Sequence, residues 1–594
     1  MNDSVWPGLG IFGESYIVFS IGTLQPVWQV VFPDCLQGDL TGICSDALLN
    51  SLSYSVVAGI ITGMIGIGLA ANIMGRRAGS ILTAAIMASG AVALLLISCL
   101  LTSTPSAMFK WMSVALFIFG VGVGGEYPLA ASSASEKAMG EMQRKMKLEL
   151  QQEESDGLLV IDEHDDDNSL PAAAGVQSDR GRQIQLVFTM QGAGIFCNSL
   201  VMTVLLLITG QVGTDDYNVA SLLVVWRISY AIGAAVLIYV LHSRWHYLQE
   251  SQVWQDDKQR RNQLARNAMA AADRVPDHHH QHQHQYNQYP GIDDNLSTIS
   301  EVSSLSAPSV ANQNDDDEDD GILNLKQVPS TDPADDLRSD VWSLLLRNYG
   351  VRLVGVSLSW MFWDVAFYGN KLFQSSFLLT LSGESTTLLE FSIAATLNSA
   401  VALAGYLGAA AIIDHPSVGR RGLQQWGFLL TGGLFVGVGF LYDNLSNGVL
   451  MTMYLGSSFF GQLGPNATTF LIPAEIFPTE MRTTCHGIAA ASGKVGALFA
   501  AIMFNYVGDL DMFLLSGYAS FAACAVTFWT IPETTGLDLY EVDRKWRMTL
   551  DGRKGEYEGD ANHRKYLSFF ERNKASMQSS LHDTSAHSYV HDAA

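Results

Sequence analysis

The chain has 594 residues, of which 48% are hydrophobic, and it carries a formal net charge of −24. An average this acidic argues against a nucleic-acid partner, yet it describes no single region, because the acidic residues gather in the polar segments 137–181, 243–341 and 533–594. Between these lie about twelve apolar segments, each near the ~20 residues that a helical bilayer crossing needs. We therefore predict a polytopic helical membrane protein, and an enzyme is excluded because no soluble domain of adequate size remains.

The first apolar segment, at about 11–32, is predicted to be a crossing rather than a cleaved signal peptide. The start MNDSVWPGLG lacks the basic region of a signal peptide. Cys35 and Cys44 follow in the next loop, where they could pair if that loop is extracellular, and the sequence leaves this open. Six cysteines do not make a disulfide framework in a chain of this length.

The crossings are predicted in two sets of six. The first set lies at 11–32, 52–73, 79–101, 109–131, 183–208 and 219–242. The second set lies at 350–380, 388–412, 422–442, 447–472, 484–507 and 512–532. Lys and Arg residues fall after the even-numbered crossings, with Lys110 the nearest exception. The positive-inside rule therefore predicts that both termini and the long central loop are cytoplasmic.

This order predicts five parts: an N-terminus 1–10, a six-helix half 11–242, a central loop 243–345, a second half 346–532 and a tail 533–594. The first half contains an acidic insert at about 137–181. We expect the insert and the central loop to be mostly disordered, since both are rich in polar residues and poor in aromatic ones. The tract HHHQHQHQYNQY could bind a metal, but its low complexity favours disorder, so no metal site and no cofactor are predicted.

The two halves repeat one another at their predicted cytoplasmic corners. Each half has a Gly-Arg-Arg motif after its second helix, and an acid and an arginine on either side of the loop before its fifth. Transporters use such a two-half architecture with a site between the halves. We expect these residues to form a cytoplasmic gate with a structural role: Arg76, Arg77, Glu136, Arg182, Asp414, Arg420, Arg421, Glu475 and Arg482.

The stretch WMFWDVAFYGNK, residues 360–371, lies in an apolar run with the length of a crossing. Trp360, Asp364 and Tyr368 are four residues apart and so share one helix face. A carboxylate at that depth is costly to desolvate and faces a partner or a water-filled cavity. Asp364 is therefore either a structural residue held by neighbouring helices or part of a binding or proton-relay site. Lys371, nearer the outer end, could snorkel to the interface.

The fourth crossing contains GVGVGGEYPL, residues 120–129. Its glycines formally match GxGxxG, but no strand–turn–helix unit surrounds them, so we reject a dinucleotide site. Glycines within a crossing instead allow close helix packing or local opening of the helix backbone. Glu126 and Tyr127 are then a buried acid and a buried hydroxyl. Glu14 in the first crossing is similar, although it could lie too near the cytoplasmic end to be buried.

Three further polar residues interrupt apolar helices. Gln191 is a lone amide in the fifth crossing and could simply bridge two helices. Asn466 follows Gly464-Pro465, where a helix break is expected. Lys494 gives the clearest indication of a functional site. A buried ammonium needs an anionic partner, which Asp364 or a bound anion would supply.

Four motifs are highly specific when they occur together: GVGVGGEYPLAASSASE, WMFWDVAFYG, GPNATTFLIPAEIFPTEMR and HGIAAASGKVGA. With them the chain resembles the phosphate:proton symporters of the major facilitator superfamily. The resemblance covers essentially every predicted crossing and fails only in the cytoplasmic insertions. It implies an all-α fold of twelve crossings in two pseudo-symmetric halves.

The resemblance also implies roles for individual residues. The proton-coupling residues would be Glu14, Glu126 and Asp364, with Glu126 standing where the family usually has Asp. Matching positions give the phosphate-binding residues: Tyr127, Gln191, Trp360, Asp364, Tyr368, Asn466 and Lys494.

The expected function is therefore uptake of inorganic phosphate coupled to protons, by alternating access of the two halves. The partners would be phosphate, protons, the lipid bilayer and cytoplasmic regulators of the loops, with the plasma membrane as location. Two alternatives stay open: a sugar or organic-ion carrier of the same superfamily, and a phosphate sensor that does not transport.

Overall fold

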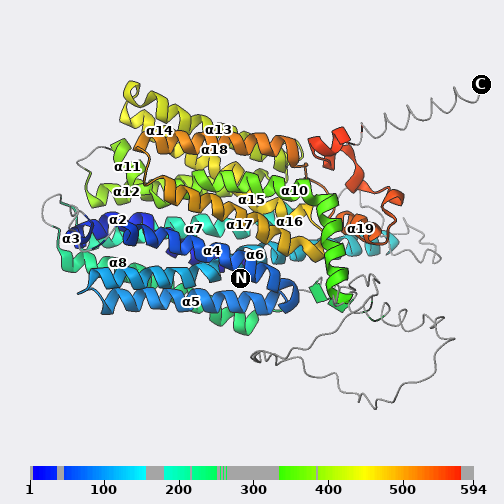
Figure 1. Cartoon of the computed structure of the whole chain (residues 1–594), viewed down its shortest axis with the longest axis horizontal. Coiled ribbons are helices and arrows are strands. Elements are labelled where there is room, and N and C mark those ends of the chain that lie inside the picture. The colour runs from blue at the N-terminus through cyan, green and yellow to red at the C-terminus, as the bar shows by residue number, and fades with distance from the viewer. Residues whose placement is uncertain are drawn as a thin grey trace, which may run out of the picture. The chain divides into compact units, whose positions relative to one another are not determined.

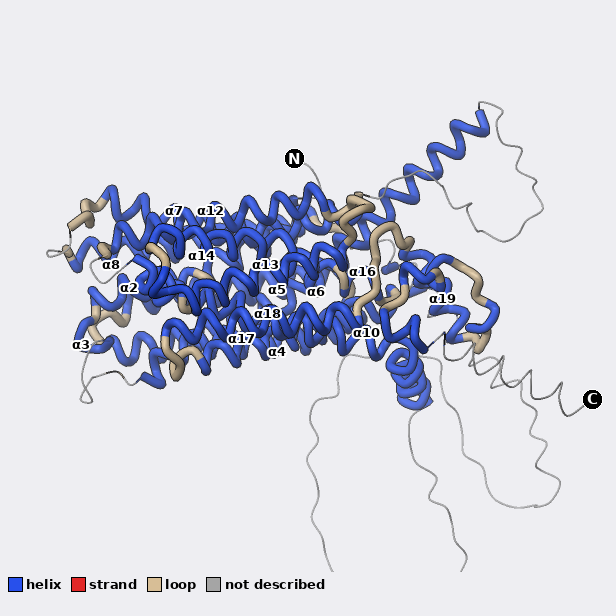
Figure 2. Tube along the Cα trace, turned by 90° about the horizontal axis from the view of Figure 1, so that it is seen from above, coloured by secondary structure: helices blue, strands red, loops and turns tan. Residues whose placement is uncertain are grey.

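The structure is a computed structural model, and it describes residues 5–36, 44, 46–155, 179–213, 217–250, 333–382, 386–574 and 576, with isolated positions 254, 255, 258, 259, 263 and 266. Within these ranges every regular element is a helix (Figure 2). By internal contacts, Met1–Lys258 with Val341–Ala594 form one unit, which contains the helical bundle, and Gln259–Asp340 form another. The His-rich and acidic tracts of the central loop lie outside the described residues.

The described part of the predicted N-terminal half consists of helices. They are α1 (Val5–Val18), α2 (Ser20–Val31), α3 (Pro33–Leu36), α4 (Asp46–Met74), α5 (Arg76–Leu100), α6 (Pro105–Ser155), α7 (Arg180–Ile208) and α8 (Val219–Tyr247).

The second half repeats this pattern and ends in a folded tail. Its helices are α10 (Pro333–Leu372), α11 (Gln374–Ser382), α12 (Leu388–Ile412), α13 (Arg420–Leu441), η1 (Tyr442–Asn444), α14 (Asn447–Gly461), the π-helical η2 (Gln462–Asn466), α15 (Ala467–Leu471), α16 (Pro473–Ile476), α17 (Thr479–Met503) and α18 (Asp509–Thr530). The tail contains α19 (Leu539–Leu550), η3 (Lys554–Glu556), η4 (Asp560–Asn562) and η5 (Arg564–Tyr566). The all-α architecture predicted from the sequence is confirmed.

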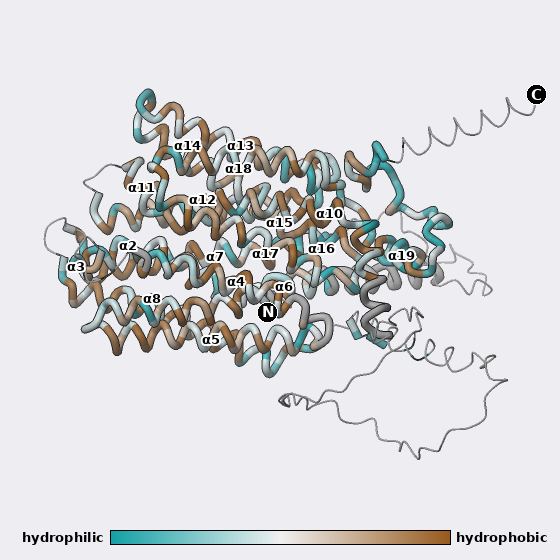
Figure 3. Tube along the Cα trace, viewed as in Figure 1, coloured by the Kyte–Doolittle hydropathy of each residue, from teal (hydrophilic) through white to brown (hydrophobic). Residues whose placement is uncertain are grey.

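The long helices run side by side, and the halves meet where α7 packs on α12 and α4 packs on α17 (Figure 1). Hydrophobic residues follow the length of these helices, whereas hydrophilic ones gather toward α19 (Figure 3). Leu207 and Ile208 are among the large apolar side chains exposed on the bundle. Such exposure is expected of helices that face lipid.

Nine helices among the described residues are long and apolar enough to cross a membrane by length and composition. The other three predicted crossings correspond to α1 with α2, α10 with α11, and α14 with η2 and α15. The first is interrupted at Phe19 and the last at η2, where Pro465 cannot donate a backbone hydrogen bond. These three crossings hold Glu14, Asp364 and Asn466, so predicted site residues lie in crossings that are divided into shorter helices.

The glycines of α6 allow the close packing that the sequence predicts. A Cβ atom added at Gly124 would lie 2.1 Å from the carbonyl oxygen of Ile60 in α4, and one at Gly120 would lie 2.4 Å from that of Val56. Both distances are far inside van der Waals contact, so only glycine permits this approach of α6 to α4.

The acidic insert differs from the prediction over its first part. Helix α6 continues past residue 137 to Ser155, where disorder was expected, while residues 156–178 lie outside the described residues. The extension is rich in Glu, Lys, Gln, Met and Leu, which are good helix formers. Because α6 is already formed, the extension needs no new nucleus, and this favours helix over disorder.

The described part of the tail, from residue 534 to residue 574, packs against the bundle. Trp546 of α19 is buried and lies edge-on to Tyr349 of α10 at 6.0 Å between ring centroids. The carboxylate of Asp543 accepts hydrogen bonds of 2.7 Å from the backbone and the hydroxyl of Thr479, the first residue of α17. At the opposite end of the bundle, Cys35 and Cys44 form a disulfide, which settles the question that the sequence left open.

Candidate functional site

A buried ion pair lies between α10 and α17. The Nζ atom of Lys494 donates a hydrogen bond to Oδ2 of Asp364 at 2.6 Å. The ammonium also lies 4.2 Å from the ring centroid of Tyr368 and 5.2 Å from that of Tyr127, distances typical of cation–π contacts. Aromatic faces and one carboxylate thus surround the cation, as the sequence predicted for Lys494 and Asp364.

The approach of α17 to this pair depends on Gly493. A Cβ atom there would lie 2.9 Å from Oδ2 of Asp364 and 2.6 Å from Cδ1 of Trp360. Trp360 also contacts His486 edge-on, with ring centroids 5.5 Å apart. The motif Ser492-Gly493-Lys494 therefore supplies the cation and also the space that lets α17 reach Asp364.

A network of amides and hydroxyls joins the two halves beside the ion pair. Gln191 of α7 donates to the hydroxyl of Tyr127 at 2.5 Å and accepts from the hydroxyl of Tyr406 of α12 at 2.6 Å. The amide of Asn466 donates to Gln191 at 3.0 Å and to Tyr406 at 2.6 Å, and its oxygen accepts from Trp363 at 2.9 Å. Gln191 thus bridges helices, and the bridge spans both halves.

We name this set the central cluster. Each of the predicted phosphate-binding residues in it is at most 3% exposed. Tyr406 and Trp363 belong to it although sequence reasoning did not select them, because an aromatic residue in an apolar helix gives no polar signal. The central cluster comprises Tyr127, Gln191, Trp360, Trp363, Asp364, Tyr368, Tyr406, Asn466 and Lys494.

The two other predicted proton-coupling acids have different surroundings. Glu14 of α1 is 1% exposed, interacts with the Tyr127 hydroxyl, and has an Oε2 atom without a hydrogen-bond partner in the described part of the chain. Glu126 is held by Arg244, whose Nη1 donates to Oε2 at 2.7 Å and whose Nη2 contacts Oε1, while Thr83 donates at 3.1 Å. Glu14 thus keeps one unpartnered oxygen, whereas Glu126 has a charged partner that the sequence did not reveal.

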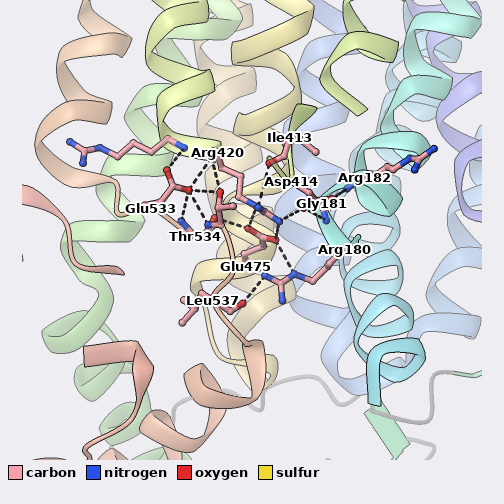
Figure 4. Close-up of polar contacts among 12 residues, drawn as sticks. Arg180, Gly181, Arg182, Ile413, Asp414, Arg420, Glu475, Glu533, Thr534 and Leu537 are labelled. Carbon is pink, nitrogen blue, oxygen red and sulfur yellow. Dashed lines mark hydrogen bonds and ion pairs between the residues drawn. The ribbon is translucent and has the colours of Figure 1, made fainter. Parts of the chain in front are cut away.

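A second group of charges surrounds Glu475 of α16, a helix that contacts α19, and Figure 4 shows the members of this group. Glu475 pairs with Nε of Arg180 at 2.9 Å and with Nε of Arg420 at 2.8 Å, and it accepts from Thr534 at 2.6 Å. Arg180 belongs to the first half and Arg420 to the second. Arg180 also donates to the carbonyl of Leu537 in the tail at 2.9 Å. Glu475 therefore fastens both halves and the tail.

Asp414 supplies another connection between the halves. It pairs with Nη2 of Arg420 at 2.8 Å and accepts the backbone N–H groups of Gly181 at 3.1 Å and Arg182 at 2.7 Å, at the start of α7. A carboxylate at a helix N-terminus satisfies otherwise unpaired donors. The side chain of Arg182 points away from Glu475 (Figure 4). The guanidinium that crosses between the halves is thus that of Arg180, not of the predicted Arg182.

We name the corner cluster as Arg180, Asp414, Arg420, Glu475, Glu533 and Thr534. Burial by itself would raise the pKa of Glu475, but Arg420 and Arg180 outweigh it and hold that pKa below the ordinary value of 4.5. The carboxylate therefore stays charged over the physiological pH range.

The repeat between the halves extends to backbone capping. Glu533, after α18, accepts the N–H of Arg420 at 2.9 Å, and Glu250, after α8, accepts the N–H of Arg76 at 2.7 Å. In both cases a glycine with positive φ precedes the arginine, Gly419 at 70° and Gly75 at 94°. Glu250 follows the sixth crossing and is far in sequence from the Gly-Arg-Arg corner that it caps, so the sequence alone does not mark it.

Three further predicted gate residues donate side-chain hydrogen bonds to backbone carbonyl groups. Arg421 donates to the carbonyl of Phe528 at 2.8 Å, and Arg77 donates to that of Leu248 at 2.7 Å, which again repeats between the halves. Arg482 is fully buried and its Nε donates to the carbonyl of Phe477 at 3.2 Å. The side chain of Glu136 lies outside the described residues.

The chain is similar in sequence and in fold to known membrane carriers. Residues 339–546 match the family model described as "Sugar (and other) transporter". The chain is 27% identical to a repressible high-affinity phosphate permease of Neurospora crassa, over 91% of this chain and 86% of that protein. It is 26% identical to an inorganic phosphate transporter of Saccharomyces cerevisiae, over 92% of this chain and 84% of that protein.

Among solved structures, the chain resembles a proton:xylose symporter of the major facilitator superfamily, with a TM-score of 0.59, 17% identity, and coverage of 91% of this chain and 98% of that one. An inward-open xylose transporter from E. coli gives a TM-score of 0.54 at 17% identity, with 91% and 99% coverage. At this identity the likeness concerns the fold.

Proposed function

We propose that this chain, which has the major facilitator fold and is a relative of the inorganic phosphate transporters, imports inorganic phosphate together with protons by alternating access. The observation that carries the proposal is the 2.6 Å Lys494–Asp364 pair, buried beside a hydrogen-bond network that joins the halves. The relatives named above are carriers of phosphate, and none of their names describes an enzyme.

The chemistry of the central cluster suits phosphate. At neutral pH phosphate keeps at least one proton, so it can donate a hydrogen bond to Asp364, whereas sulfate would meet that carboxylate as like charge without a proton to share. Lys494 offsets the charge of the anion, and Tyr127, Gln191 and Asn466 offer hydrogen bonds to its oxygens.

Proton coupling follows from the same charges. Phosphate competes with Asp364 for the ammonium of Lys494, and a carboxylate that loses its cationic partner in a buried site favours the protonated form. Glu14, which interacts with Tyr127 and has an unpartnered oxygen, is a second place for the proton. A proton that enters with the anion reduces the net negative charge that is buried in the central cluster.

Contacts at both ends of the bundle support alternating access. Near α19 the halves are joined by Arg180 and Glu475. At the opposite end Asn505, which follows the last turn of α17, donates to the hydroxyl of Tyr54 of α4 at 3.2 Å. Contacts between the halves at both ends support a state in which the central cluster is enclosed, and a rocking carrier would pass through such a state between its two open forms.

The distribution of charge supports an orientation with both termini cytoplasmic, which is the orientation expected for a carrier in the plasma membrane. Basic residues concentrate near the α19 end. The Cys35–Cys44 disulfide lies at the other end, and disulfides persist on the oxidising side of a membrane.

Uptake of labelled phosphate into a transport-deficient cell, with and without a proton gradient, tests the function. The proposal expects uptake that collapses with the gradient. Uptake that ignores the gradient would remove proton coupling, uptake of a sugar in place of phosphate would favour the sugar carrier, and phosphate binding without uptake would favour the sensor.

A further inference from the structure

Lys371 of α10 is a buried ammonium that the proposed mechanism does not use. Its side chain is 2% exposed, which corrects the expectation that it snorkels to the interface. Its Nζ atom has no hydrogen-bond partner and forms no ion pair in the described ranges. Lys494, with the same chemistry, has a carboxylate at 2.6 Å.

The position of Lys371 relates it to the central cluster. It lies seven residues after Asp364 and three after Tyr368, which places all three on the same side of α10. At 1.5 Å per residue, Lys371 is about 10 Å from Asp364 along the helix, on the side away from α19. It is therefore one to two turns outward from the Lys494–Asp364 pair.

Lys371 lies in the seam between the halves. Gly22 of α2 packs so closely that an added Cβ atom would be 2.3 Å from the carbonyl oxygen of Lys371. In the same seam Ser375 donates to Gln25 of α2 at 3.4 Å, and a cavity of about 60 Å³ is lined by Gln25, Leu372 and other residues of α2, α4, α10 and α17. Separation of the halves at this end would uncover Lys371.

The unpartnered groups here are donors. Besides Nζ of Lys371, the Nε2 atom of Gln374, one turn further, is buried without a hydrogen-bond partner among described residues. An ammonium and an amide N–H group need acceptors, and an unpaired buried charge is strongly unfavourable. A small oxyanion such as phosphate supplies the acceptor oxygens and the negative charge that these two groups lack.

We propose that Lys371 and Gln374 form an outer anion site, where inorganic phosphate binds as it enters and from which it passes to Lys494. This inference rests on the proposed function, and it adds a second phosphate-binding site on the path of entry. Binding at the open seam neutralises the ammonium of Lys371, and transfer inward brings the anion to the central cluster.

The test is the dependence of initial uptake on external phosphate in Lys371→Met, with Lys110→Met as matched control, because Lys110 is an exposed lysine near the same end. We expect Lys371→Met to raise KM about tenfold, the loss of about one charge-assisted hydrogen bond, with kcat within about twofold. Lys371→Arg should keep KM within about threefold, and Lys110→Met should match the parent.

Thermal stability of the phosphate-free protein gives a second readout. Lys371→Met should unfold at a higher temperature than the parent, because it removes an unpartnered buried charge, whereas Lys494→Met should unfold at a lower one, because it strands Asp364. If Lys371→Met does not reach the membrane, Gln374→Leu replaces it, with an expected rise in KM of about threefold.

An unchanged KM in the folded Lys371→Met protein, or in Gln374→Leu where that variant is used, overturns the outer anion site. If phosphate uptake is absent in the parent, the proposed function fails instead. If the parent takes up phosphate and Lys494→Ala does not, while Lys371→Met matches the parent, the outer site alone is wrong.

Discussion

The central cluster and the corner cluster each contain a fully buried ion pair, but the two are bonded very differently. Lys494 and Asp364 share one hydrogen bond within one half, and aromatic rings supply the other contacts of the cation. Glu475 accepts from two arginines and a threonine that come from both halves and from the tail region.

This difference distinguishes a ligand-binding site from a structural contact that holds the two halves together. A buried pair held by one bond can exchange its partner for a ligand of the same charge at small cost, whereas a pair held by several bonds must lose them together. We therefore expect changes in the central cluster to abolish transport chemistry, and changes in the corner cluster to alter which state of the carrier is populated.

The largest effect is expected from Asp364→Asn. The amide keeps the shape of the carboxylate but neither pairs with Lys494 nor accepts a proton, so uptake should fall by about a hundredfold or more at near-normal expression. Asp443→Asn, at an exposed acid in η1, is the control and should transport like the parent. Near-parental uptake by Asp364→Asn would show that the pair is only structural.

The next effect is expected from Arg180→Gln, which removes one guanidinium that joins the halves. The α19 end should open more often, uptake should fall about tenfold, and the buried thiol of Cys485, near the start of α17, should react faster with a thiol reagent. Arg182→Gln is the matched control, because only its backbone N–H group contacts Asp414. Equal labelling of Cys485 in both variants would mean that Arg180 does not hold this end closed.

These two residues also show why part of the site escaped prediction. Arg180 and Arg182 are two positions apart, so their side chains leave the helix in nearly opposite directions. Which of them faces Glu475 depends on where α7 begins, and Asp414 of the other half fixes that start. A tertiary contact therefore decides a question that the local sequence leaves open.

Charged residues in apolar helices could be predicted as site residues, because their cost of burial is evident from the local sequence alone. Asp364 and Lys494 are too costly in an apolar helix to be there without partners, so their presence alone pointed to a site. Tyr406 and Trp363 are ordinary residues for an apolar helix, so only their hydrogen bonds in the structure mark them as members of the central cluster. The helical extension of α6 to Ser155 was not predicted, because the insert as a whole is polar and poor in aromatic residues, although the residues of the extension favour helix.

A smaller effect, on stability, is expected where the tail meets the bundle. Burial opposes the charge of Glu571, but its pairing with Arg352 at 2.7 Å holds the pKa of Glu571 below the ordinary value of 4.5. A depressed pKa contributes stability above about pH 4.5 that is lost as the pH falls through the folded-state pKa. Glu571→Gln should lower the free energy of unfolding by about 1 kcal/mol at pH 7 and lose this difference in acid. A deficit independent of pH in thermal melts would contradict the ionic role.

The smallest effect is expected from deletion of residues 275–325 in the central loop. This segment is outside both clusters, and polar low-complexity sequence adds little to a packed core. Uptake by the deletion variant should stay within about twofold of the parent at equal surface expression. Loss of uptake with normal insertion would assign the segment to the transport mechanism.

The central claim is that Lys494 holds the transported anion, and phosphate-dependent thermal stabilisation of the purified protein tests it most directly, because any ligand that binds the folded state must raise its melting temperature. The account predicts that phosphate stabilises the parent, stabilises Lys494→Ala not at all, and stabilises Lys494→Arg only in part, since a flat guanidinium does not replace a compact ammonium. A folded Lys494→Ala protein that phosphate stabilises as strongly as the parent would place the anion elsewhere.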